Sequence, residues 1–485
     1  MLKKIHPYVK IIFTFVSVIL IGTLLLALPI SSNSGKSLGF VDSLFTATSA
    51  TCVTGLSVTS ITTELTVFGK VVMIILMEIG GLSFITITVF FFTIVGAKIG
   101  LSNRFLLREQ LNQSSVEGLI GLVKRIVIIS FSIQIFFAVF NWYPFHLYLR
   151  YHIDNGTLSS LGIERESLST VEQYVYSLFI SMFHSAASFN NAGFDILGDS
   201  SMQMFQTGSN VIPTWALITI NCTTMLMIVL GGIGFVVYSD VTRNRFRWKY
   251  FSLHTKLVLT TTALLILFGA GLVWLSANYV QSGHYINSEG NLVQVPKMHV
   301  MEAFFTSITC RTAGFATYDM SALVSLPVTY MITIILMIVG ASPCSTGGGV
   351  KTTTFGVIAL AIYYFARGKD TKAYKRRISD EQVSKAFVLM LLALMIVIIG
   401  SGIVLAIQPS LDSKAVLFEV VSAFSTTGLT MGITSSLGVA NRIVIVFIMF
   451  FGRLGPLTII GVLNKNWMAN TKEEIQYAKE NVIIG

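Results

Sequence analysis

Four short segments of the sequence resemble one another, and each ends in a glycine that is followed by a large apolar residue. A phenylalanine stands ten residues before each of these glycines. An internal repeat of this kind indicates one structural unit that the chain uses four times. We expect each unit to be a short helix that ends in a loop built on its glycine. The segments are Phe45–Leu56, Phe183–Phe194, Phe304–Phe315 and Phe418–Leu429.

The composition identifies the environment of these segments. Of the 485 residues, 53% are hydrophobic and 12% are charged, and the mean hydropathy is +0.74. Soluble domains carry about twice that share of charge. We therefore predict a polytopic membrane protein surrounded by lipid. The net charge of +10 fits basic cytoplasmic loops, so we expect no nucleic-acid partner.

Eight apolar runs, arranged as four pairs, approach the length of about 20 residues that a spanning helix needs. One of the four segments lies inside each pair and is too short to cross a bilayer. Irregular backbone at membrane depth is tolerated only inside protein or along a water-filled cavity, so each segment should enter and return on one face. The first members of the pairs are 11–30, 118–141, 256–277 and 384–408, and the second members are 68–96, 211–238, 324–366 and 438–464.

The predicted fold is an all-α membrane protein with four covalently linked helix–pore-loop–helix repeats around one central pore. The third repeat differs, because Gly340–Gly349 places a proline and three consecutive glycines inside an apolar run, and these residues do not hold a regular helix. The predicted boundaries are 1–97, 98–242, 243–367 and 368–465 for the four repeats, and 466–485 for a cytoplasmic tail.

The positions of lysine and arginine predict the orientation of the chain in the membrane. They gather between the pairs, at 98–108, 243–256 and 367–385, and near both termini. Because basic loops stay in the cytoplasm, both termini should be cytoplasmic and the pore loops should enter from outside.

The four loops could form a cation selectivity filter. Backbone carbonyls around one axis can replace the hydration shell of an alkali cation. A glycine permits the positive φ that such a carbonyl often requires, and the helix before it directs its negative end toward the path. A glycine can also be an ordinary helix C-cap, but four in register favour a shared ring. One filter glycine per loop predicts looser selection of potassium over sodium than a tetrameric potassium channel achieves.

Candidate ion-binding residues surround each glycine. We expect Arg311 to point behind the filter, toward loop carbonyls or an acid such as Asp195, and not to bind an ion. Asp42 and Glu302 should stabilise the positive ends of two pore helices. The candidates are Thr51, Cys52, Val53, Thr54 and Gly55; Asn190, Asn191, Ala192 and Gly193; Arg311, Thr312, Ala313 and Gly314; and Ser425, Thr426, Thr427 and Gly428.

These loops, above all Phe189-Asn-Asn-Ala-Gly-Phe194 and Arg311-Thr-Ala-Gly-Phe315, resemble those of the Trk/Ktr/HKT superfamily of potassium transporters. The likeness runs over nearly the whole chain and is greatest to the membrane subunits of bacterial Ktr systems. It implies potassium uptake across the bacterial plasma membrane, often stimulated by sodium. It also implies a homodimer that docks on a cytoplasmic ring of KtrA-type subunits, which bind ATP or ADP. This chain itself would bind no cofactor, and K+ would meet only filter carbonyls.

The resemblance also implies a gate. The broken segment would be an intramembrane gating loop, with Lys351 beside it and Arg453 lining the pore. An arginine inside an apolar run usually faces a partner or water, so Arg453 could hold the loop through its carbonyls or pair with Glu78. The gate residues are Gly340, Ala341, Ser342, Pro343, Cys344, Ser345, Thr346, Gly347, Gly348, Gly349, Lys351 and Arg453.

Two other classes of function are alternatives to a gated potassium pathway. A carrier of cations or solutes that alternates between two states could also contain broken helices and parallel repeats. A membrane enzyme would need convergent catalytic groups, and the sequence shows no Ser/His/Asp set, metal-ligand cluster or nucleotide loop. His184 and Glu419, each nine residues before a filter glycine, should form hydrogen bonds behind the filter.

Overall fold

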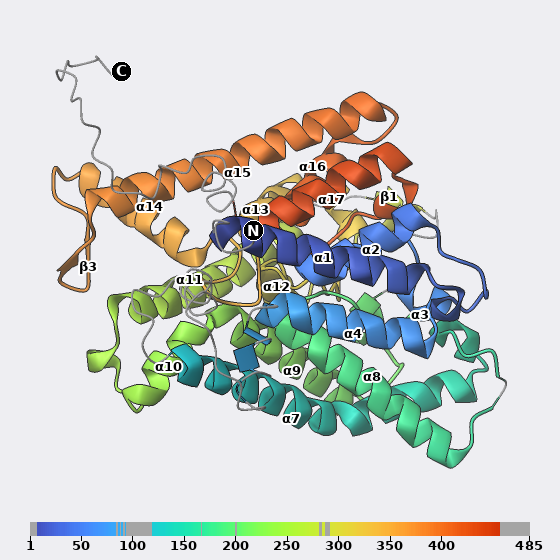
Figure 1. Ribbon diagram of the computed structural model, residues 1–485. Helices are drawn as coiled ribbons and strands as arrows, with labels where there is room; N and C mark the ends of the chain where they lie inside the picture. The colour runs from blue at the N-terminus through green and yellow to red at the C-terminus, as the bar shows by residue number, and fades with distance from the viewer. Residues whose placement is uncertain are drawn as a thin grey trace.

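The computed structural model describes residues 7–83, 86–87, 89–90, 93, 119–165, 167–198, 201–280, 284–286 and 292–455. Within these ranges the chain is mostly helical, and its strands form two short antiparallel hairpins. Figure 1 shows the long helices side by side, with α10 and the β3–β4 hairpin at one end of the molecule and β1 and α3 at the other. The hairpins are β1 (His284–Ile286) with β2 (Leu292–Gln294), and β3 (Lys372–Ala373) with β4 (Arg376–Arg377).

Five described helices are long and apolar enough to cross a membrane. Four of them correspond to the predicted first members of the pairs, and the fifth lies in the predicted run 211–238. The expectation of a helical membrane protein is therefore confirmed. These helices are α1 (Pro7–Ala27), α7 (Leu119–Asp154), α9 (Thr214–Ile233), α11 (Leu253–Leu275) and α15 (Asp380–Ile407).

In the first, second and fourth pairs, a residue with positive φ interrupts the second member of the pair. Helix α4 (Val67–Leu82) ends at Ser83, where φ is +68°. Helix α9 ends at Gly234, where φ is +98°, and α10 (Phe235–Arg243) follows. A right-handed helix cannot continue through such a conformation. We expected 211–238 to be continuous, and this was wrong.

The fourth pair ends in the same way. Helix α17 (Val439–Leu454) stops at Gly455, where φ is +79°. The rest of the predicted run 438–464, and most of 68–96 beyond α4, lie outside the described residues. In the third pair the predicted break is present, and it separates α13 (Pro327–Ile338) from α14 (Thr352–Phe365).

Four helices carry the repeated segments, and we call them the pore helices. They are α2 (Phe40–Cys52), α8 (Thr170–Asn190), α12 (Val300–Thr309) and α16 (Ser413–Ser425). Helix α8 has 21 residues, more than the dozen expected. The remaining elements are short: α3 (Ile61–Glu64), η2 (Pro29–Ser31), η3 (Leu158–Leu161), η4 (Ser201–Phe205), η5 (Trp248–Tyr250), η6 (Ser276–Val280), η7 (Met320–Ser325) and η8 (Thr434–Ser436).

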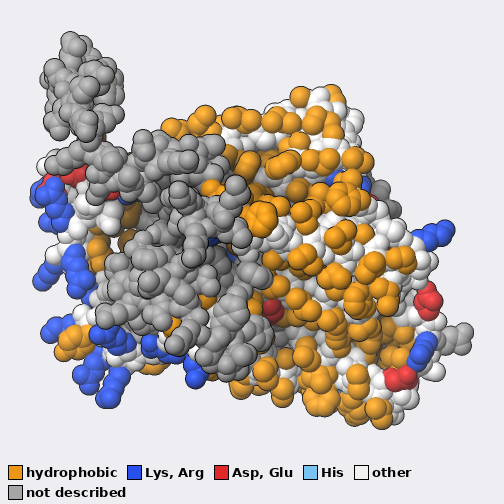
Figure 2. All heavy atoms as spheres, in the orientation of Figure 1, with side chains coloured by type: hydrophobic (Ala, Val, Ile, Leu, Met, Phe, Trp, Pro, Cys, Tyr) orange, Lys and Arg blue, Asp and Glu red, His pale blue; other side chains and the backbone are white. Residues whose placement is uncertain are grey.

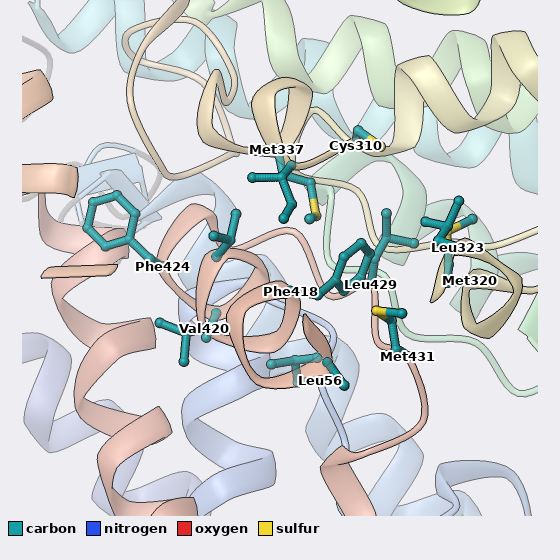
Figure 3. Packing of buried hydrophobic residues seen from close by; sticks show 14 of the residues in the cluster. Leu56, Cys310, Met320, Leu323, Met337, Phe418, Val420, Phe424, Leu429 and Met431 are labelled. Atoms are coloured by element: carbon teal, nitrogen blue, oxygen red, sulfur yellow. The ribbon is translucent and has the colours of Figure 1, made fainter. Parts of the chain in front are cut away.

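The apolar residue after each repeated glycine is anchored in the core. Leu56, Phe194, Phe315 and Leu429 are each at most 2% exposed. Figure 3 shows Leu56 and Leu429 in one cluster with Phe418 of pore helix α16. Burying one such side chain contributes about 1.5–3 kcal/mol. Each loop is therefore fixed to the core immediately after its glycine.

The surface agrees with a membrane environment. In Figure 2 hydrophobic side chains cover a broad region of the visible face between its two ends. Lysine and arginine gather at the end that holds α10 and the β3–β4 hairpin, whereas charges of both signs are scattered at the other end. An apolar belt between polar ends is what a bilayer requires.

Candidate functional site

The four repeated glycines meet in a closed ring. Each glycine packs against the carbonyl oxygen of the residue that precedes the next glycine around the ring. A Cβ atom would meet that oxygen at 2.6 Å on Gly55, at 2.7 Å on Gly193 and at 2.5 Å on Gly314, and Gly428 closes the ring against Thr54. Real Cβ atoms do not approach so closely, so every position requires glycine. Segments that are far apart in the sequence thus form one site, which we call the glycine ring.

All four ring glycines have positive φ, as the sequence analysis expected. The values are +97° at Gly55, +69° at Gly193, +82° at Gly314 and +90° at Gly428. Side chains rarely adopt this conformation, because a Cβ atom would crowd the backbone. Both the conformation and the space therefore exclude larger residues.

A second residue in each loop also has positive φ, which no sequence pattern predicts. This residue lies two positions before the glycine, and φ is +58° at Val53, +58° at Asn191, +71° at Thr312 and +53° at Thr426. Only asparagine adopts this conformation readily, and a β-branched valine or threonine does so at a cost of about 1–3 kcal/mol. The surrounding ring imposes the conformation four times.

Each pore helix ends at the ring through a hydrogen-bonded turn. The amide before the glycine donates to a carbonyl five residues earlier, at 2.8 Å, in the first, second and fourth loops. In the third loop Ala313 N donates to Thr309 O at 2.9 Å instead. These turns close the helices and leave their negative ends directed at the ring.

The ring offers oxygen atoms from carbonyl groups and hydroxyls. The hydroxyls of Thr51, Thr54 and Thr427 are buried and have no hydrogen-bond partner among the residues that the structure describes. The hydroxyls of Ser49 and Ser422 accept hydrogen bonds from the amides of the first and fourth ring glycines, at 3.1 Å and 3.0 Å. Neutral oxygens beside helix C-termini suit a weakly hydrated monovalent cation. A multivalent metal ion usually requires charged ligands such as carboxylates. In the described part of the chain no group of three or more His, Cys, Asp or Glu residues could hold a metal ion.

Glycines on the second helices bring those helices against the pore helices. Gly80, Gly231 and Gly452 each face the carbonyl of the residue four positions before a ring glycine, and a Cβ atom on any of them would clash with it. These glycines therefore allow the second helices to pack closely against the pore helices.

The broken segment 340–349 lies against these second helices. Ser342 N donates to Gly232 O of α9 at 3.0 Å, and Phe235 N donates to Cys344 O at 2.8 Å. The break in the helix at Gly234 frees the amide of Phe235 for this bond. The segment also closes on itself, because Gly340 N donates to Val350 O at 2.8 Å.

The same segment touches three of the four ring loops. Gly348 N donates to the hydroxyl of Thr426 at 3.0 Å. The hydroxyl of Thr346 donates to the carbonyl of Phe189 at 3.3 Å, and Gly347 packs directly against Thr312. Segment 340–349 therefore adjoins the ring and contacts its second, third and fourth loops.

Two basic side chains hold this segment by its carbonyls. Lys351 Nζ donates to Gly347 O at 2.8 Å and to Gly348 O at 3.2 Å. Arg453, in the last turn of α17, donates through Nη1 to Thr346 O and through Nη2 to Gly80 O. Of the two partners considered for Arg453, loop carbonyls are the ones present. Glu78 forms no ion pair with it, and that alternative was wrong.

Other expected contacts differ in detail. Arg311 is only 5% exposed, and its Nη2 donates to the hydroxyl of Thr262 on α11 at 3.3 Å. It thus points away from the ring, but the expected partner Asp195 instead accepts from Ser201 Oγ at 2.7 Å and from Leu197 N at 3.2 Å.

Polar residues in the pore helices behave as expected. His184 Nε2 lies 2.8 Å from the hydroxyl of Thr224, and the carboxylate of Glu419 accepts hydrogen bonds from Thr430 and Thr434. Glu302 accepts from the amide of His299, three residues earlier at the start of α12, at 3.0 Å. These contacts fix the pore helices from behind.

An ion pair that sequence analysis did not suggest joins the first and fourth pore regions. Asp42, in the first turn of α2, pairs with Arg442 of α17. The two residues are 400 positions apart, so no local pattern could relate them. Arg442 also donates to Leu437 O at 2.8 Å. The pair closes the seam between the two ends of the chain.

Comparison with known proteins decides the family. The family model described as TrkH, cation transport protein, matches residues 2–467. The chain belongs to the TrkH family. It is 38% identical over 482 residues to Ktr system potassium uptake protein B of Bacillus subtilis, covering 99% of this chain and 96% of the relative. It is 33% identical over 493 residues to potassium/sodium uptake protein NtpJ of Enterococcus hirae, covering 100% and 98%.

A solved structure has the same fold. The crystal structure of the potassium transporter TrkH from Vibrio parahaemolyticus matches with a TM-score of 0.66 at 16% identity, over 96% of this chain and 86% of that one. The family model and the curated relatives confirm the family resemblance seen in the loops. The TrkH family consists of transport proteins, so the expectation that this chain is not an enzyme is confirmed as well.

Proposed function

We propose that this chain is the ion-translocating subunit of a potassium uptake system and that K+ passes through the glycine ring. The observation that carries this proposal is the closure of the ring by Gly55, Gly193, Gly314 and Gly428. The curated relatives are named as potassium or potassium/sodium uptake proteins. The ring supplies what such a function needs, namely oxygens arranged around an axis to replace water on a cation.

The filter comprises the seventeen candidate residues around the ring, although they serve it differently. The carbonyls of Thr54, Ala192, Ala313 and Thr427, next to the ring glycines, are the proposed ligands. Arg311 supports its loop from behind and does not meet the ion. Because each loop has a single ring glycine, we expect modest discrimination between potassium and sodium.

The gate is segment 340–349 together with Lys351 and Arg453. Its support is the position of the segment against three ring loops and its attachment by two basic side chains. The attachment through Arg453 comes from a separate helix, α17, and can be released when that helix moves relative to the segment. Opening would then require Arg453 to leave the carbonyl of Thr346.

The architecture proposed around this pathway is four helix–pore-loop–helix repeats, with boundaries at 1–97, 98–242, 243–367 and 368–465 and a tail at 466–485. Four pore helices, each followed by a loop that contributes one glycine to the ring, support the repeat. We place the chain in a bacterial plasma membrane with both termini cytoplasmic. The basic end of the molecule, at α10 and the β3–β4 hairpin, supports this orientation.

The proposed partners are suggested by the name of one relative, the Ktr system potassium uptake protein B of Bacillus subtilis. We propose a homodimer on a cytoplasmic KtrA-like ring that binds ATP or ADP. This chain then needs no cofactor, and nucleotide control reaches the gate through the cytoplasmic KtrA-like ring.

Ion flux in liposomes tests the filter. Purified protein is reconstituted, and uptake of K+, Rb+ and Na+ is measured for Gly314→Ser, Gly428→Ser and the control Gly402→Ser. A Cβ atom on Gly402 meets no atom within 4 Å, so the control should behave as wild type. The ring variants should change the ratio of K+ to Na+ uptake while the protein still purifies as a folded particle. Unchanged ratios in both would refute the assignment. Flux no faster than carriers reach would favour alternating access instead.

A further inference from the structure

An apolar groove of about 700 Å³ runs along α11 and both halves of the broken helix. Its volume is within the range of about 300–1,000 Å³ typical of ligand sites. Leu264 and Phe268 of α11, Ile335 of α13 and Leu360 of α14 line it. The wall of the groove therefore belongs to membrane-spanning segments. It includes α13, before the break in the helix, and α14, after it.

Two glycines shape the wall. Gly269 and Gly356 both line the groove. A Cβ atom on Gly269 would come within 2.5 Å of Ser307 Oγ, and one on Gly356 would come within 2.9 Å of Thr261 Oγ1. Helix α11 thus approaches its neighbours closely at two levels. The absent side chains also leave backbone as part of the groove surface.

The groove faces the hydrocarbon of the bilayer. Leu264 is 52% exposed, Phe268 66% and Ile335 58%. Apolar surface at this depth meets acyl chains, and an empty groove would forfeit dispersion contacts on one side. The natural occupant of such a groove is therefore a lipid chain.

The end of the groove near the β3–β4 hairpin is positively charged. Lys372 and Tyr374 of the hairpin line it, and Lys256 lies with Nζ 5.8 Å from the ring centre of Tyr374. Figure 1 shows the hairpin beyond the end of α14, beside α11. A lysine and a tyrosine hydroxyl at the interface offer donors to a phosphate.

Nearby acids do not neutralise this end. The carboxylates of Asp370 and Asp380 lie 3.4 Å and 3.5 Å from the guanidinium of Arg377. Among the described residues that line the groove, none is acidic. Lys372 forms no ion pair with any described residue and lies 5.8 Å from the ring centre of Tyr364. Its charge is available to an anion.

We propose that this groove binds one anionic glycerophospholipid from the leaflet on the side of the hairpin. One acyl chain lies between α11 and the broken helix, and the phosphate binds Lys372 and Lys256. Because the chain contacts α13 and α14 at once, it joins the two halves of the helix that carries segment 340–349. The binding site follows from the groove and its charge, and it does not depend on the proposed ion pathway.

Native mass spectrometry of the full-length protein tests this proposal. The protein is reconstituted in nanodiscs with equal amounts of phosphatidylglycerol and phosphatidylcholine, then released and weighed. Wild type should retain one phosphatidylglycerol per chain. Lys372→Gln should lower the preference for phosphatidylglycerol about fivefold, and Ala359→Phe, which fills the groove, should abolish retention of either lipid.

Two control variants carry changes of the same kind outside the groove. Arg376→Gln removes a charge from the same hairpin outside the groove, and Leu391→Phe adds bulk to the exposed face of α15. Both should retain lipid as wild type does. Equal retention of the two lipids in all variants would overturn the proposal. The proposal would also be overturned if Ala359→Phe converted a dimer into a monomer and left the bound lipid unchanged. A second copy of the chain, and not a lipid, would then cover the groove. If Ala359→Phe does not fold, Lys372→Gln against Arg376→Gln decides alone.

Discussion

Replacing Arg453 by alanine should open the pathway. The guanidinium joins three parts of the molecule, because it extends from α17 and donates to Thr346 O of segment 340–349 and to Gly80 O of α4. Only the bond to Thr346 holds the segment itself. The bond to Gly80 joins two helices and acts on the gate indirectly.

The size of the effect follows from that one bond. A hydrogen bond from a charged donor contributes about 1.5–3 kcal/mol. If the bond is present only in the closed state, its loss shifts the equilibrium toward the open state by the same amount. Since 1.4 kcal/mol is a factor of ten, the open population should rise about 10- to 100-fold until the open state predominates.

Lysine at position 453 distinguishes the effect of the hydrogen bond on flux from the effect of the positive charge. Lysine keeps the positive charge, but its compact ammonium group cannot hold two separate carbonyls as a planar guanidinium does. Arg453→Lys should therefore raise flux less than Arg453→Ala. If the charge alone blocked the path, Arg453→Lys would match wild type.

The assay is 86Rb+ uptake into liposomes that contain purified protein without any cytoplasmic partner. Arg376→Ala, a change on the exposed β3–β4 hairpin, is the control. Melting curves exclude unfolding as the cause of any change. Flux of Arg453→Ala equal to that of wild type, with both proteins folded, would refute the argument that Arg453 holds a closed gate.

Three further predictions concern neighbouring contacts. Lys351→Gln should also raise flux, since it weakens two bonds to segment 340–349, and unchanged uptake would contradict this. Gly452→Ala should lower the melting temperature or prevent assembly, because its Cβ atom would clash with a pore-helix carbonyl; a melting curve like that of wild type would show that the contact can relax. Asp42→Asn should reduce the unfolding free energy by about 1–3 kcal/mol by weakening its bond to Arg442, whereas equal stability in thermal melts would mean that the seam does not depend on this pair.

The repeated segments were predictable because their constraint is local. A glycine in a crowded loop with positive φ cannot be replaced, and the apolar residue after it must reach the core, so both leave a pattern in the sequence. Segment 340–349 was visible for the same reason, since proline and consecutive glycines exclude a regular helix. The ring formed by Gly55 and its counterparts was therefore foreseeable as a set of four.

Features imposed by tertiary contacts were not predictable. The left-handed conformation of Val53 contradicts the preference of valine, and it exists because the ring surrounds it. Gly234 breaks a helix, although the nearby Gly231 and Gly232 lie within the helix that ends there. The pairing of Asp42 with Arg442 connects the two ends of the chain. Such contacts depend on the assembled fold, and a single sequence holds no local record of them.

The proposed function depends on a dehydrated cation at the glycine ring. Crystals of the protein soaked in Rb+ or Tl+, with anomalous scattering measured, test this most directly. We predict an anomalous peak on the axis of the ring, with the carbonyl oxygens of Thr54, Ala192, Ala313 and Thr427 as its nearest protein atoms. Ordered loops with no peak on that axis, in protein that still transports Rb+, would contradict it.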